Sequence, residues 1–130
     1  METQGNRILI VDDEPALLKM MGVYLTRKGF AVTTLDSTER ARLAIQNSAA
    51  EIDAAVIDGS LRGFSAQDLA LQLLAANAAA RVIVASGYPV DMTRLEEAGA
   101  ERVCFIQKPF TSESLAGTLR RMLASEEEDV

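Results

Sequence analysis

The sequence predicts a single α/β domain in which a parallel five-stranded sheet is doubly wound, with helices on both faces. Three observations predict this fold. Five short aliphatic runs recur along the 130 residues, helical patterns fill the intervals between them, and no Pro-, Gly- or Ser-rich linker divides the chain. Parallel strands need crossover connections of about a dozen residues, so this alternation indicates parallel pairing. The composition, 48% hydrophobic and 25% charged, is typical of a globular domain.

The expected strands are continuously apolar and do not alternate, which is typical of strands covered on both faces of a parallel sheet. One of them, Phe30–Thr34, is weaker than the rest. Right-handed crossovers between the strands would place helices on both faces. The four strong runs are Ile8–Val11, Ala54–Ile57, Arg81–Ala85 and Arg102–Ile106.

The first helix is expected to follow Asp13, because Glu14 and Pro15 supply a first-turn acid and a helix-compatible proline. It should end at Gly29, a residue suited to the backbone conformation that follows a helix. Four further helices are expected: one capped by Ser37 or Thr38, one after Ser65, one over Met92–Ala98 and one from Thr111 or Ser112.

The residue types that are missing exclude many chemistries. The chain has no histidine and one cysteine, so it has no Ser-His or Cys-His nucleophile system, imidazole zinc site or internal disulfide. Carboxylates, hydroxyls, lysine, arginine and the backbone remain. Thirteen basic against 19 acidic residues give a net charge of −6, which argues against direct binding of nucleic acid or of an anionic membrane.

The chain is expected to be cytoplasmic and not inserted in a membrane. It has no apolar run near the roughly 20 residues that a membrane-spanning helix needs. Residues 1–6 also lack the basic-then-apolar layout of a secretory signal. We expect an N-terminal tail over residues 1–6, one domain over 7–124 and an acidic C-terminal tail over 125–130.

Polar groups follow the carboxyl ends of four expected strands, the edge at which ligands bind in doubly wound sheets. Asp12 and Asp13 follow the first run, Asp58 the third, Ser86 the fourth and Lys108 the last. Each has an ordinary interpretation when taken alone, such as a helix cap, a first-turn charge or a turn. If the sheet is correct, however, these groups meet at one edge.

Together these side chains predict a Mg²⁺-dependent phosphoryl site. Three neighbouring carboxylates repel one another unless a cation neutralises them, and hard oxygen ligands suit Mg²⁺. A lysine and a hydroxyl opposite the acids provide what the other oxygens of a phosphoryl group need. A carboxylate can itself accept the phosphoryl group and form an aspartyl phosphate.

Four segments resemble, in order and spacing, the receiver domain of two-component response regulators. The resemblance runs from about residue 7 to about residue 123, and implies a signalling domain rather than an enzyme. It also implies a flavodoxin-like (βα)5 three-layer sandwich with strand order 2-1-3-4-5. The segments are Ile8–Glu14, Val56–Asp58, Val84–Gly87 and Lys108–Phe110.

The resemblance implies that Asp58 is the phosphoacceptor, and that its phosphoryl group comes from a phosphohistidine of a sensor kinase or phosphotransfer protein. It implies that Mg²⁺ is held by Asp12, Asp13, Asp58 and the backbone carbonyl of Ser60. The segment over residues 86–89, Ser-Gly-Tyr-Pro, is more similar to receivers of hybrid histidine kinases than to those of DNA-binding regulators.

The remaining implied roles concern the switch. Lys108 would neutralise the phosphoryl oxygens, Ser86 would be the hydroxyl that moves to the phosphoryl group, and Phe105 would be the aromatic switch. The Lys108–Pro109 bond is commonly cis in this family. A downstream protein would read the face built from the fourth helix, the last strand and the last helix.

Two alternatives stay open from the sequence. A haloacid-dehalogenase-like Mg²⁺-dependent phosphatase also uses an aspartyl nucleophile, but it needs a second aspartate two residues after the first. Glu14 stands at that place relative to Asp12. The other alternative is a pseudo-receiver that binds partners without being phosphorylated, although all the acceptor-site residue types are present.

Overall fold

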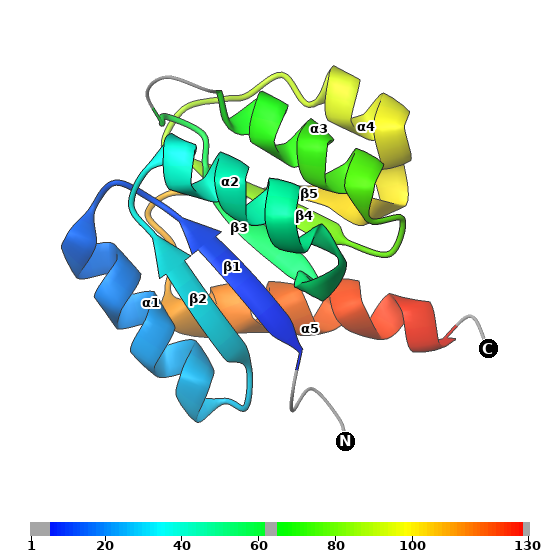
Figure 1. Ribbon diagram of the computed structural model, residues 1–130. Helices are drawn as coiled ribbons and strands as arrows, with labels where there is room; N and C mark the ends of the chain where they lie inside the picture. The colour runs from blue at the N-terminus through cyan, green and yellow to red at the C-terminus, as the bar shows by residue number, and fades with distance from the viewer. Residues whose placement is uncertain (1–5, 62–64, 129–130) are drawn as a thin grey trace.

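The described part of the chain, residues 6–61 and 65–128 of a computed structural model, is built around a parallel five-stranded sheet (Figure 1). The strand order is β2-β1-β3-β4-β5, and each neighbouring pair is parallel, so the predicted fold is confirmed. The strands are β1 (Arg7–Val11), β2 (Ala31–Leu35), β3 (Ala54–Asp58), β4 (Arg81–Ser86) and β5 (Val103–Gln107).

Helices cover both faces of the sheet in the described residues, and make the structure three-layered (Figure 1). One layer contains α1 (Pro15–Arg27) and α5 (Ser112–Glu128). The other contains α2 (Thr38–Ser48), α3 (Ala66–Ala76) and α4 (Thr93–Gly99). Two short 3-10 helices, η1 (Ala49–Glu51) and η2 (Ala100–Arg102), follow α2 and α4.

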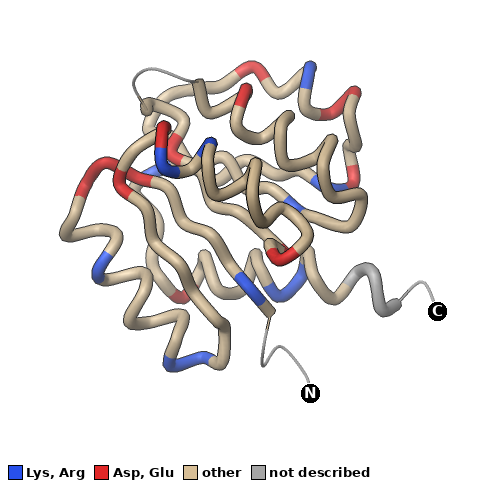
Figure 2. Tube along the Cα trace, viewed as in Figure 1, with Lys and Arg blue, Asp and Glu red and all other residues tan. Residues whose placement is uncertain are grey.

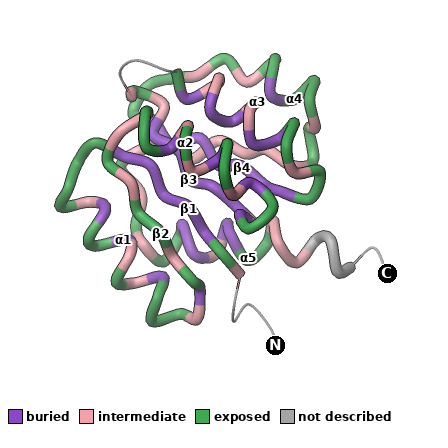
Figure 3. The backbone as a smooth tube through the Cα atoms, viewed as in Figure 1, coloured by how far each residue is buried: buried purple, intermediate pink, exposed green. Residues whose placement is uncertain are grey.

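Apolar side chains build two cores, one on each face of the sheet (Figure 3). In β1, Leu9 and Val11 belong to the core with α2 and α3, whereas Ile8 and Ile10 belong to the core with α1 and α5. The central strands β3 and β4 are buried along their whole length. This explains why their sequences do not alternate between apolar and polar residues.

Local signals in the sequence place several helix ends correctly. Pro15 occupies the first turn of α1, and Gly29 after that helix has a positive φ of 101°. The side chains of Ser37 and Ser65 accept hydrogen bonds from the backbone N–H three residues later, which caps α2 and α3. The predicted beginnings of these helices are therefore confirmed.

The edge strands differ from prediction by one residue at their starts. Phe30 does not begin β2, because its N–H donates to the carbonyl of Leu25 and its side chain is buried below the end of α1. Arg102 does not begin β5, because it belongs to η2. At the other end of the chain α5 runs to Glu128, so the helix continues into the acidic segment. None of the described helices has both the length and the apolar character needed to cross a bilayer.

Arg102 ties η2 to the end of α3, a contact that local sequence patterns did not predict. Its Nε donates to the carbonyl of Ala80 at 3.0 Å, and its Nη2 donates to the carbonyls of Leu74 at 3.1 Å and of Asn77. The carbonyls at the end of a helix lack partners within that helix, and a cation is favourable beside them. The guanidinium therefore stabilises the junction between α3, β4 and β5.

Replacing Arg102→Ala should lower the free energy of unfolding by roughly 2 kcal/mol, because hydrogen bonds from a charged group contribute about 1.5–3 kcal/mol. Urea unfolding followed by circular dichroism would measure the change. The matched control is Arg120→Ala, which removes an exposed arginine of α5. Equal stabilities of the two variants would contradict the role given to Arg102.

Candidate functional site

The carboxyl ends of β1, β3 and β5 meet at one edge of the sheet. The chain passes from β1 to β2 on one side and returns to β3 on the other, so strand order reverses between β1 and β3. Open α/β sheets bind ligands at such a reversal. Acidic residues gather here, with a long acidic stretch after β1 (Figure 2).

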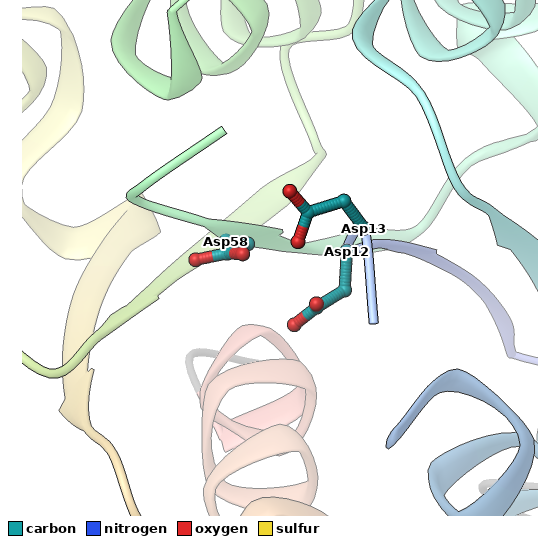
Figure 4. A group of neighbouring side chains, drawn as sticks. All are labelled: Asp12, Asp13 and Asp58. Carbon is teal, nitrogen blue, oxygen red and sulfur yellow. The ribbon is translucent and has the colours of Figure 1, made fainter. Parts of the chain in front are cut away.

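Three carboxylates lie together at this edge (Figure 4). One oxygen each from Asp12, Asp13 and Asp58 lies within 4.8 Å of the other two. Asp12 and Asp58 are each only 3% exposed, whereas Asp13 is exposed. Hard carboxylate oxygens with access to water are the donor set that Mg²⁺ prefers, so these residues fit the predicted ion.

Lys108 reaches the same edge from the end of β5. Its Nζ lies 3.0 Å from Asp12 Oδ2 and 3.4 Å from Asp58 Oδ1. Burial would lower the pKa of Lys108, but the two carboxylates outweigh that effect and the pKa is raised. The side chain is therefore a cation at neutral pH, placed between the ends of three strands.

The surroundings of Asp12, unlike those of Lys108, disfavour its charged form. Burial raises the pKa of this carboxyl, although hydrogen bonds from Lys108 and from the Glu14 backbone oppose the effect. The neighbouring Asp58 carboxylate raises it further. A cation with more than one charge would relieve this cost, which is the physical reason to expect a divalent ion here.

Asp58 is held through one of its two oxygens. Its Oδ1 accepts from the backbone N–H of Ser60 at 3.0 Å and from the Ser60 hydroxyl at 2.9 Å, and it faces Lys108. Within residues 6–61 and 65–128, no donor is hydrogen-bonded to Oδ2. The hydroxyl contact was not predicted, although an Asp-x-Ser sequence is a signal for such a local turn. The predicted metal contact of the Ser60 carbonyl stays a prediction.

The other predicted residues lie around this cluster. Ser86 is buried at the end of β4, and its Oγ accepts from the backbone N–H of Tyr88 at 3.1 Å. The carbonyl of Ser86 accepts from the backbone N–H of Lys108 at 2.9 Å. Phe105 is half-buried on β5 beside Val84. The Lys108–Pro109 bond is cis, as the resemblance implies.

The sequence matches the response regulator receiver domain over residues 8–120, which is most of the chain. The chain belongs to this family. Receiver domains act in two-component signalling, bind Mg²⁺ at an acidic pocket and interact with histidine kinases and downstream effectors. The resemblance drawn from the four sequence segments is thus confirmed.

Two relatives of this receiver domain are longer proteins. It is 28% identical over 130 residues to the DNA-binding response regulator MtrA of Mycolicibacterium smegmatis, a match that covers 99% of this chain and 55% of MtrA. It is 32% identical over 110 residues to a cyclic di-GMP phosphodiesterase of Thermotoga maritima, covering 83% of this chain and 28% of that protein. The chain therefore spans only about half of the first relative and a smaller share of the second.

Solved receiver structures share the fold. A CheY-like receiver from Methanospirillum hungatei superposes with a TM-score of 0.84 at 23% identity, over 98% of this chain and 100% of that one. The receiver domain of the hybrid histidine kinase CckA gives a TM-score of 0.75 at 26% identity, over 90% and 98%. These comparisons do not favour the phosphatase or pseudo-receiver alternatives.

Mg²⁺ affinity should fall as the pH is lowered, and the fall should begin at a higher pH than an ordinary aspartate would cause. The raised pKa of Asp12 means that the metal-free site takes up a proton readily, whereas Mg²⁺ needs the ionised carboxylate. Calorimetric Mg²⁺ titrations at a series of pH values measure this dependence.

Asp12→Asn should weaken Mg²⁺ binding about tenfold or more and flatten its pH dependence, because the proton that competes is removed. Glu113→Gln, which neutralises an exposed acid in the first turn of α5, is the control with the same change in charge. An Asp12→Asn variant that kept the pH dependence of the wild type would assign the competing proton to another group.

Proposed function

We propose that this receiver domain accepts a phosphoryl group on Asp58 from a phosphohistidine of a histidine kinase or histidine phosphotransfer protein. One observation carries the proposal: the Ser60 N–H, the Ser60 hydroxyl and Lys108 all face Oδ1 of the Asp58 carboxylate, whereas no donor among the described residues is hydrogen-bonded to Oδ2, which we assign as the nucleophilic oxygen. The sequence supports the choice of donor, because the chain has no histidine of its own.

In the proposed step, Oδ2 of Asp58 attacks phosphorus while the bond between phosphorus and the imidazole nitrogen breaks. The nitrogen keeps the electron pair, so the products are an aspartyl phosphate and a free histidine on the partner. Mg²⁺, held by Asp12, Asp13, Asp58 and the Ser60 carbonyl, would neutralise charge on the phosphoryl oxygens.

Lys108 has the position to support the same transfer. Its ammonium is 3.4 Å from Asp58 Oδ1 and is anchored by Asp12, so it lies beside any group attached to Asp58. A cation already in place stabilises negative charge without having to reorganise during the reaction. We assign to this receiver domain no enzymatic turnover beyond self-catalysed transfer and loss of its own phosphoryl group.

The output of the domain is proposed to be a change of surface. The phosphoryl charge on Asp58 would draw the Ser86 hydroxyl toward it, and Phe105 would bury its ring in response. Partner proteins would read the face formed by α4, β5 and α5, where β5 is a partly exposed edge strand of the sheet. We propose that this module comprises residues 7–124, acts in the cytoplasm and makes no nucleic-acid contact of its own.

The full chain incubated with Mg²⁺ and acetyl phosphate should gain one phosphoryl group that is stable in acid and labile in base. Asp58→Asn, which keeps the size of the side chain but removes the nucleophile, should abolish it. Intact-mass spectrometry measures the modification. Asp68→Asn on α3 is the control with the same chemical change.

The outcomes separate the candidate functions. Modification of the Asp58→Asn variant at the wild-type level would reject Asp58 as the acceptor, and absence of modification of the wild type would favour the pseudo-receiver. Sustained hydrolysis of a general phosphate ester would instead favour the phosphatase.

Ser86→Ala should leave phosphorylation of Asp58 possible but reduce the response of the α4-β5-α5 face, because the hydroxyl that links β4 to the phosphoryl group is lost. Amide chemical shifts with and without beryllofluoride, a phosphoryl mimic, measure this response. Ser48→Ala, at the end of α2 beside the amino end of β1, is the control. An undiminished response in Ser86→Ala would remove Ser86 from the switch.

A further inference from the structure

The loop between β4 and α4, residues 87–92, is held against the rest of the domain from two sides. It carries the backbone N–H of Tyr88, which donates to Ser86 Oγ and so fixes the present position of that hydroxyl. Any movement of Ser86 toward a group on Asp58 has to change this loop. The contacts that hold the loop therefore bear on the proposed switch.

On its inner side the loop lies close to β3 because residue 59 has no side chain. A Cβ at Gly59 would lie 3.0 Å from Ser86 Cβ, which is closer than side chains normally pack, and 3.4 Å from Val90 Cγ2, which is an ordinary van der Waals contact. Val90 also packs against the core between the sheet and α2, α3 and α4. Gly59, the first residue after β3, therefore forms part of the surface on which the loop packs.

On its outer side the loop is tied to α3 by one side chain. The Nε2 of Gln67 donates to the backbone carbonyl of Asp91, and Gln67 Oε1 accepts from Arg94 Nη1 on α4 at 3.4 Å. Asp91 in turn accepts from the Thr93 N–H at 3.0 Å through its carboxylate. Gln67 therefore joins three segments: α3, the loop and the first turn of α4.

We propose that Gln67 is a positioning residue that latches the β4–α4 loop in its resting conformation and thereby opposes the movement of Ser86. This inference rests on the proposed function of Asp58 and names a regulator of the same site. The amide has the geometry for the task, because it donates to a loop carbonyl and accepts from α4 at the same time. Gln67 does not touch the carboxylate cluster, so it acts through the loop.

The direction of the effect follows from which state the contact stabilises. The Gln67 bond is present when Ser86 Oγ is engaged by Tyr88, so removing it destabilises the resting loop. A net hydrogen bond changes an equilibrium by about two- to tenfold. A phosphoryl mimic binds preferentially when the loop is in its switched position. Its binding to the variant should therefore become tighter by that factor.

The test is a calorimetric titration of the Mg²⁺-saturated full chain with beryllofluoride. Gln67→Glu keeps the shape of the side chain but has no donor for the Asp91 carbonyl, and Gln67→Ala removes the contact entirely. Both should bind beryllofluoride about two- to tenfold more tightly than the wild type, with unchanged Mg²⁺ affinity. Gln46→Glu, an exposed position on α2, is the matched control and should bind as the wild type does.

A second measurement tests the contact between Gln67 and the loop independently of phosphoryl-mimic binding. In the ligand-free protein, the amide protons of Tyr88 and Thr93 should exchange faster in the Gln67 variants and not in Gln46→Glu. Unchanged exchange, or equal or weaker beryllofluoride binding by the Gln67 variants, would overturn the proposal. If the wild type bound no beryllofluoride, the proposed function would fail, and the exchange rates would still decide whether Gln67 holds the loop.

Discussion

The fold forces two buried carboxylates together at the ends of adjacent parallel strands, and the chemistry of the site depends on this constraint. Asp12 and Asp58 are each 3% exposed, and each directly follows one of the paired residues Val11 of β1 and Ile57 of β3. Asp13 adds a third negative charge within 4.8 Å. Burial and mutual repulsion raise the free energy of the metal-free site, and the raised pKa of Asp12 expresses that cost. The same closeness of the carboxylates makes the site attract a divalent cation.

The cation that the chain itself provides is placed by the backbone of the neighbouring strand. The N–H of Lys108 donates to the Ser86 carbonyl. This bond joins the end of β4, which carries the serine hydroxyl, to the end of β5, which the lysine directly follows. The ammonium then crosses the ends of the strands to reach Asp12 and Asp58. The position of the charge and the position of the hydroxyl are therefore not independent: a displacement of the end of β4 changes both.

The sequence is informative where the physical cause is local. Continuous apolar runs mark strands buried on both faces, and Ser37, Ser65 and Gly29 mark helix ends, so the doubly wound architecture and the position of the acidic cluster could be predicted, whereas the strand order came from the family resemblance. Contacts that join distant segments could not be predicted. Arg102 shows no local signal that its guanidinium would bind the carbonyls of α3, and Gln67 reads as an ordinary helical residue until α4 is placed beside α3. In both cases the partner is a backbone carbonyl, which any sequence could supply.

The close approach of Ser86 to the residue after Asp58 gives a physical reason why, in the proposed switch, a single added charge would suffice. Asp58 and Gly59 are consecutive, the N–H of Gly59 donates to the Ala85 carbonyl at 2.7 Å, and the missing side chain at Gly59 lets Ser86 approach β3. A residue with a side chain at 59 would need Ser86 to shift by a few tenths of an ångström, because its Cβ would lie 3.0 Å from Ser86 Cβ. In the proposed switch, coupling from site to surface would need one bistable element, the β4–α4 loop, rather than a chain of small displacements across the core. The described residues hold that loop by few polar contacts, so the two positions of the proposed switch would differ little in free energy, which is the condition under which one new charge changes their populations.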